Sequence, residues 1–135
     1  MLTFLRPIRF EEIDAAGIVF FARYLTICHD AMEAVFDPLP GGYRALITER
    51  RIGFPAVHTE CDFKAPLRYG DVVRVETRVV KIGETSVTFA FTLSRTRDEV
   101  LCAEVTHTTV VSALDTIVKT KMPDDVRAVL TAHLG

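Results

Sequence analysis

The chain has 135 residues, of which 49% are apolar and 25% charged, so its composition is that of a globular domain and excludes a disordered chain. Sixteen Lys and Arg against eighteen Asp and Glu give a net charge of −2, which leaves no bulk positive field for nucleic acid or an anionic membrane. No apolar run approaches the ~18 residues that span a bilayer, so membrane insertion is not expected.

The first residues lack the order of a signal peptide, and the length predicts one domain over residues 1–135. Three cysteines, Cys28, Cys61 and Cys102, are widely spaced and form no CxxC pair. This spacing argues against a disulfide framework or a zinc site and is typical of a cytoplasmic protein. No metal-ligand spacing and no glycine-rich phosphate loop occurs, so we expect no metal site.

The first third of the chain predicts a strand, a turn and a helix. Residues 2–10 alternate loosely, and residues 11–17 are typical of a turn. Apolar residues then recur at helical spacing over residues 21–36, on a face so wide that the helix is expected to be buried. Residues 37–42 end it, and a second, weaker helix is expected over residues 43–51.

Four further strands follow from period-two alternation, over residues 56–63, 71–82, 85–95 and 99–112. Short connections between them predict antiparallel neighbours, and Pro123 predicts the start of a short last helix. The fold class is therefore α+β, with a five-stranded antiparallel sheet packed on one long buried helix. One helix cannot cover such a sheet, and an edge strand stays open, so self-association is expected.

Residues 10–25, FEEIDAAGIVFFARYL, resemble the opening of the hotdog-fold acyl-CoA thioesterases, and most closely their 4-hydroxybenzoyl-CoA thioesterase branch. Residues 64–71, KAPLRYGD, also resemble this family's turn between its second and third strands. The likeness is collinear over nearly the whole chain. It implies a single hotdog thioesterase domain, in which a five-stranded antiparallel sheet wraps around one long central helix.

The resemblance implies hydrolysis of an acyl thioester to a free acid and a thiol. Asp14 matches the family's catalytic carboxylate, which acts as nucleophile or as general base on water; from the residues alone it is equally a turn or cap carboxylate. Phe21 matches the position whose backbone N–H polarises the thioester carbonyl. The first N–H groups of a helix suit this role because they have no intrahelical partner and lie at the positive end of its dipole. No cofactor is expected, since coenzyme A is part of the substrate.

The acyl group is expected to run beside the helix and against the second strand of a partner chain, in a homodimer or homotetramer. The expected substrate contacts are Gly17, Ala22, Tyr24, Cys28, His29, His58 and Glu60. His29, where relatives often carry an acid, either packs against the sheet or a partner chain or lines the acyl pocket.

His58 and Glu60 share one face of a strand, which is either an exposed face or a pocket wall that orders the attacking water; His107 is read in the same way. Cys28-His29-Asp30 is not a nucleophile triad, because consecutive helix residues point in different directions.

Relatives often place basic residues for the nucleotide phosphates at the turn between the third and fourth strands, but here this turn contains Glu84, whose charge has the wrong sign. The expected coenzyme A contacts are Lys81, Thr85, Ser86, Lys64 and Arg68. If these residues hold the phosphates weakly, the acyl group arrives instead on an acyl carrier protein.

Two other functions stay open. A hotdog dehydratase or hydratase ranks low, because residues 20–23, FFAR, place no His at the helix start. A non-catalytic acyl-CoA binding module or acyl-carrier partner protein is the second alternative, and the presence of Asp14 argues against it.

Overall fold

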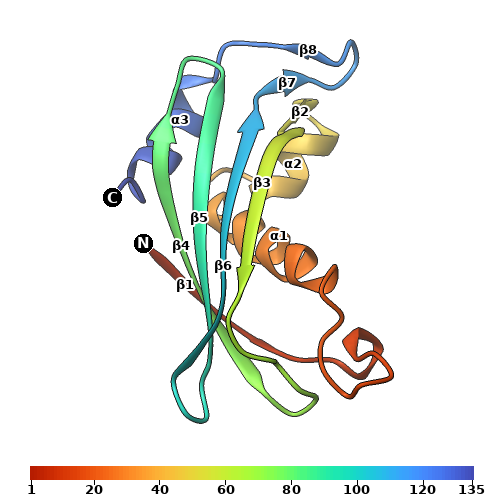
Figure 1. The fold of residues 1–135 in the computed structure, drawn as a ribbon. Coiled ribbons are helices and arrows are strands. Elements are labelled where there is room, and N and C mark those ends of the chain that lie inside the picture. Colours follow the sequence, from red (N-terminus) through yellow and green to blue (C-terminus); the bar gives the residue numbers. More distant parts are fainter.

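A five-stranded antiparallel sheet dominates the computed structural model, which describes all of residues 1–135 (Figure 1). The strand order is β1-β4-β5-β6-β3. All five predicted strands are present: β1 (Leu2–Pro7), β3 (Ala56–Phe63), β4 (Val72–Ile82), β5 (Ser86–Arg95) and β6 (Val100–Val110). A small second sheet was not predicted, and it joins β2 (Ile52–Gly53), β7 (Ser112–Ala113) and β8 (Val118–Lys119). Its strands have two residues each, too few to show an alternation in the sequence.

Three α-helices accompany the sheet: α1 (Arg23–Val35), α2 (Gly42–Thr48) and α3 (Asp124–Thr131), together with a short 3-10 helix, η1 (Phe10–Glu12). The longest, α1, has 13 residues, α2 packs on α1 and β2, and α3 packs on β4. The expected sheet wrapped around one long central helix is therefore too simple a description. None of these helices has the length and apolar character needed to cross a membrane.

The connection between β3 and β4 corrects the expectation that short connections join neighbouring strands. The β4–β5 and β5–β6 pairs are antiparallel neighbours, as predicted, but β3 pairs with β6 instead of β4. Residues 64–71 can reach ~26 Å when extended, whereas three strand spacings span only ~14 Å. A connection of this length therefore does not determine which strand is the neighbour.

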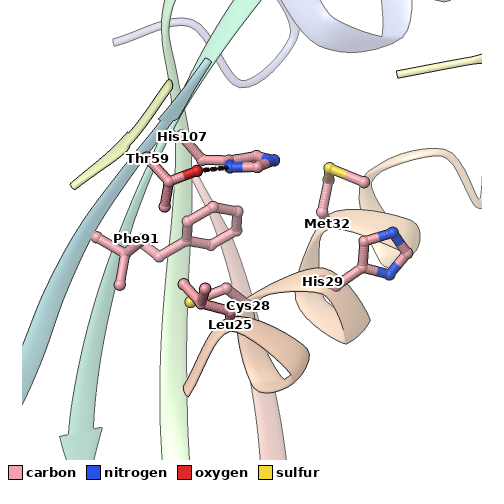
Figure 2. A pocket seen from close by; sticks show the side chains of 8 residues that line it. Leu25, Cys28, His29, Met32, Thr59, Phe91 and His107 are labelled. Carbon is pink, nitrogen blue, oxygen red and sulfur yellow. Dashed lines mark hydrogen bonds between the residues drawn. The ribbon is translucent and has the colours of Figure 1, made fainter. Parts of the chain in front are cut away.

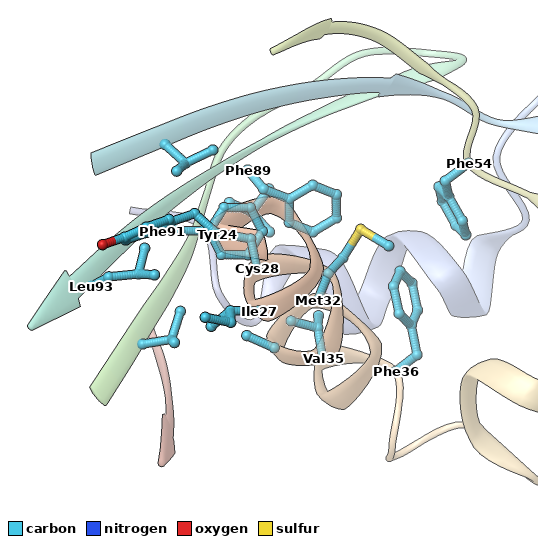
Figure 3. Packing of buried hydrophobic residues seen from close by; sticks show 14 of the residues in the cluster. Tyr24, Ile27, Cys28, Met32, Val35, Phe36, Phe54, Phe89, Phe91 and Leu93 are labelled. Atoms are coloured by element: carbon cyan, nitrogen blue, oxygen red, sulfur yellow. The ribbon is translucent and has the colours of Figure 1, made fainter. Parts of the chain in front are cut away.

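The core lies between α1 and the inward faces of β4 and β5 (Figure 3). Val87, Phe89, Phe91 and Leu93 alternate along β5 and are all buried, as the period-two pattern predicts. They meet a helix face whose buried residues are Tyr24, Ile27, Cys28, Ala31, Met32 and Val35. The three- and four-residue spacing of this face predicts the buried helix, because these positions lie on one side of the α-helix.

The two edges of the main sheet differ in how far they are covered. Beyond β1, the C-terminal residues bond to β4: the Val79 N–H donates to the His133 carbonyl at 2.9 Å, and the Gly135 N–H donates to the Val79 carbonyl at 3.0 Å. The other edge, β3, has seven of its eight residues exposed, including Val57 at 61% and Phe63 at 51%. The edge strand that was expected to stay open is therefore β3.

Ile27 tests the packing of α1, because its side chain is fully buried against the sheet. We expect Ile27→Ala to lower the free energy of unfolding in urea by about 2–5 kcal/mol, through lost burial and the cavity left behind. The neighbouring exposed residue provides a control, since Thr26→Ala should change stability by no more than about 0.5 kcal/mol. Equal effects of the two substitutions would contradict this packing.

Candidate active site

Asp14 lies in a tight loop between η1 and α1. Its N–H donates to the Ile18 carbonyl at 2.9 Å, and its own carbonyl accepts from the Gly17 N–H at 3.0 Å. The Asp14 Oδ1 atom accepts from the Ala16 N–H at 2.8 Å, whereas Oδ2 has no hydrogen bond within the chain. One carboxylate oxygen is therefore used to hold the loop, and the other is free to meet a substrate.

Gly17 gives the loop its shape. Its φ is +80°, a conformation that residues with a Cβ atom rarely adopt, although no atom within 4 Å would contact such a Cβ. Gly17 was expected to contact substrate, but it is not among the residues that line the groove beside Asp14. Its role in the structure is to turn the backbone.

A buried ion pair attaches this loop to the rest of the fold. Arg6 Nη1 donates to Glu12 Oε1 at 2.8 Å, Nη2 lies 2.8 Å from Oε2, and Arg6 Nε donates to Asp30 Oδ2 at 2.9 Å. Arg6 is 7% exposed and Glu12 only 2%. Burial on its own would raise the pKa of Glu12, but the hydrogen bonds from Arg6 and from the Arg9 N–H, together with the Arg6 charge, outweigh it and lower the pKa.

Glu12 is buried, although an acid in a turn-like segment of the sequence is typically solvated. The signal that would have found the pair is the position of Arg6, which shares the inward face of β1 with the half-buried Leu2 and Phe4. An arginine at an inward position requires an acidic partner, because a buried charge is costly unless it is paired.

The N-terminus of α1 has no capping side chain. The N-cap residue is Ala22, and no side chain bonds to the first turn. The Phe21 and Ala22 N–H groups donate to no acceptor within the chain, while the next two N–H groups bond back to the Phe20 and Phe21 carbonyls. Two free donors therefore stand at the positive end of the helix, as expected for Phe21.

Asp14 and Phe21 line the same open groove, which has a volume of about 470 Å³. Tyr24 and Phe63 form one wall, with their ring centroids 5.1 Å apart and nearly perpendicular, and Lys64 adds a cation. Burial raises the pKa of the Tyr24 hydroxyl, so Tyr24 stays un-ionised. The remaining lining residues are Ile18, Val19, Ala65 and Pro66.

A smaller cavity of about 170 Å³ lies between α1 and the sheet (Figure 2). Cys28 and His29 line it from α1, where both were expected to contact substrate. Burial raises the pKa of the Cys28 thiol, His29 Nδ1 lies 3.1 Å from Glu33, and Asp30 bonds to Arg6. As predicted, these three consecutive residues form no catalytic triad.

The structure does not bring His58 and Glu60 to either cavity. In the β3–β6 register the odd-numbered residues Thr59 and Cys61 stand opposite His107 and Val105, on the side that faces α1. His58 and Glu60 lie on the other face of β3 and bond to one another at 2.9 Å. Within one chain these two expected substrate contacts therefore do not line the acyl pocket, because successive strand residues point to opposite faces.

The expected coenzyme A contacts fall into two groups. Lys64 lines the groove, and the Arg68 backbone forms a bridge with Ile18 in the Asp14 loop. Lys81, Thr85 and Ser86 lie at the other end of β4, about 30 Å away if each strand residue advances ~3.3 Å. One chain therefore does not gather all five residues at a single site.

Comparison with known proteins identifies the family. The model of the "Thioesterase-like superfamily" matches residues 8–130. The chain belongs to this superfamily. It is 35% identical over 105 residues, 77% of each chain, to a 1,4-dihydroxy-2-naphthoyl-CoA hydrolase of Synechococcus elongatus. It is also 32% identical over 124 residues to a namesake from Nostoc punctiforme, across 92% of this chain and 82% of that one.

Solved structures agree on the fold. A 1,4-dihydroxy-2-naphthoyl-CoA thioesterase from Synechocystis superposes with a TM-score of 0.86 at 24% identity, covering 96% of this chain and 94% of that one. A gentisyl-coenzyme A thioesterase superposes with a TM-score of 0.83 at 25% identity, covering 93% of this chain and 99% of that one. This member of the superfamily is thus a hotdog-fold thioesterase, an enzyme that hydrolyses acyl-CoA thioesters.

The Arg6–Glu12 pair makes a prediction about stability and pH. At pH 7, Glu12→Gln should lower the free energy of unfolding by about 3 kcal/mol, because it leaves a buried guanidinium without its main partner. The folded-state pKa of Glu12 lies below its ordinary value of 4.5, so the contribution of the pair is present above that pH and is lost as the pH falls through the folded pKa.

The difference between wild type and Glu12→Gln should therefore shrink in urea titrations run at decreasing pH. The exposed neighbour supplies the control, and Glu11→Gln should leave the curves unchanged. If the free energy of unfolding of wild type exceeds that of Glu12→Gln by the same amount at pH 7 and pH 3, Glu12 is not held ionised by Arg6.

Proposed function

We propose that Asp14 is the catalytic carboxylate of this thioesterase and that the Phe21 and Ala22 N–H groups bind the oxyanion. One observation carries the proposal: a carboxylate oxygen without a partner and the uncapped helix N-terminus belong to the same groove. Helix N–H donors at the place where negative charge develops lower the barrier because they are already oriented.

The reaction follows from these groups. The thioester carbonyl oxygen accepts from the Phe21 N–H, with Ala22 as second donor. As general base, Asp14 takes a proton from a water whose oxygen bonds to the carbonyl carbon. The tetrahedral oxyanion then collapses, the carbon–sulfur bond breaks, and the thiolate leaves and takes up the proton.

As nucleophile, Asp14 would instead bond to the carbonyl carbon and expel the thiolate, and water would then hydrolyse the mixed anhydride. Both routes need one carboxylate at the same place. Neither needs a metal or a redox cofactor, because the thioester supplies its own leaving group.

We infer that the preferred acyl group is aromatic. The similar enzymes are named for dihydroxynaphthoyl and gentisyl thioesters, whose acyl groups are aromatic. In this chain, Tyr24 and Phe63 form an aromatic wall beside the groove, and Phe91 lines the cavity beyond it. Lys64 stands at the groove to meet an anionic part of coenzyme A.

The active unit proposed here is a homodimer joined along β3. This strand is the one long edge without a neighbour, and its inward residues Thr59 and Phe63 line the two cavities. An edge-to-edge pairing of two β3 strands would close both cavities on their open side. The second copy would also contribute its own basic residues, such as Lys81, to bind the phosphates of coenzyme A.

Asp14→Asn keeps the shape of the side chain and removes the ionisable carboxylate. We expect kcat/KM for aromatic acyl-CoA thioesters, followed by thiol release, to fall by about 10² or more. The exposed Asp124 lies at the start of α3, so Asp124→Asn should leave the rate unchanged and serves as control. Equal rates for wild type and Asp14→Asn would show that Asp14 is not the catalytic carboxylate.

The dimer is tested by a charge on the open edge. Val57→Lys should shift the sedimentation coefficient from dimer to monomer, because edge lysines oppose strand pairing, and activity should fall with it. Val118→Lys places the same charge on the exposed β8 and should change neither property. A wild-type chain that sediments as a monomer and is fully active would contradict the proposal.

A further inference from the structure

The 170 Å³ cavity is apolar over most of its lining but polar in part. Leu25, Cys28 and Met32 come from α1, and Phe91 and Val105 come from the sheet. The polar lining is His29 of α1 together with Thr59 of β3 and His107 of β6, and the last two stand opposite one another in the β3–β6 register. In Figure 2 the imidazole reaches from the sheet across the cavity towards Met32 of α1.

His107 is held by one ring nitrogen only. Its Nδ1 lies 2.7 Å from Thr59 Oγ1, and its Nε2 has no hydrogen-bond partner in the chain. Burial lowers the pKa of His107, and the nearby His29 lowers it further, so the imidazole is neutral near pH 7. A neutral imidazole carries its proton on either Nδ1 or Nε2. The Thr59 hydroxyl can rotate to accept from Nδ1 or to donate to it. Nε2 can therefore accept from a ligand in the first case or donate to one in the second.

The cavity lies at the right distance from the proposed oxyanion site. Cys28 is six residues beyond Ala22, which corresponds to about 9 Å along the helix axis at 1.5 Å per residue. This is the reach of an acyl group one or two rings long. The volume agrees, because a cavity of about 150 Å³ is known to hold one benzene ring.

We propose that His107, oriented by Thr59, determines specificity by forming a hydrogen bond from Nε2 to a ring hydroxyl of an aromatic acyl group. The inference rests on the proposed function and names the residue that distinguishes hydroxylated from unhydroxylated acyl groups. A ring without the hydroxyl would exclude water from Nε2 and leave it unpaired. A site built for a hydroxyl rejects the analogue that lacks it for this reason.

The test compares kcat/KM for benzoyl-CoA with that for 2-, 3- and 4-hydroxybenzoyl-CoA. Wild type should prefer at least one hydroxylated substrate by about 10-fold or more. His107→Leu should bring this ratio close to one, because a leucine neither bonds to the hydroxyl nor is left unpaired without it, and His107→Gln, which keeps a hydrogen-bonding group, should retain part of the preference.

Thr59→Val is the second variant, and it removes the orienting hydroxyl at nearly constant volume. It should also reduce the ratio, whereas Thr106→Val, whose side chain is on the opposite face of the sheet, should not. Circular dichroism verifies that each variant is folded.

The outcomes separate the two proposals. A wild-type preference that survives in both His107→Leu and Thr59→Val overturns the role of His107, and so does a wild type that hydrolyses all four substrates equally well. A wild type that hydrolyses none of them overturns the proposed aromatic acyl-CoA function itself, and the role of His107 with it.

Discussion

The ion pair between Arg6 and Glu12 is the interaction on which the geometry of the site depends. It joins β1 to the segment that leads into the Asp14 loop, and the third partner, Asp30, extends the same guanidinium contact to α1. The Glu12 carbonyl also accepts from the Phe20 N–H at 2.9 Å, just before the helix begins. Because the charges are buried, the loop cannot move away from the helix N-terminus without leaving a guanidinium or a carboxylate unpaired. The carboxylate and the free N–H groups are thus kept at one groove by a contact that takes no part in the chemistry.

Most of the fold could be predicted from the periodicity of the sequence. Strands β4 and β5 and helix α1 bury regular sets of apolar residues, and such sets reveal themselves by spacing alone. The position of β3 beside β6 could not be predicted, because pairing across the sheet depends on contacts distant in sequence. The two-residue strands of the second sheet could not be predicted for a different reason, since they are too short to show an alternation.

Backbone physics and the family resemblance point to the same residues of the candidate site. Asp14 and the Phe21 N–H were named in advance, and they line one groove. Choosing pocket residues by chemical type was less successful, since His58 and Glu60 are polar but stand on the outer face of β3. The alternation of side chains along β3 was the better guide, because it places Thr59 and Phe63 on the face towards α1. Only the structure could bring Thr59 to His107, which lies 48 residues away.

The most direct test is the structure of the chain with an inert thioether analogue of hydroxybenzoyl-CoA, in which a methylene separates the sulfur from the carbonyl. The carbonyl oxygen should lie about 2.7–3.1 Å from the Phe21 or Ala22 nitrogen. Asp14 Oδ2 should face the carbonyl carbon, and the ring should enter the cavity beside Cys28 and His107. A carbonyl bound away from the N-terminus of α1, with Asp14 turned from it, would show that these groups are not the catalytic site.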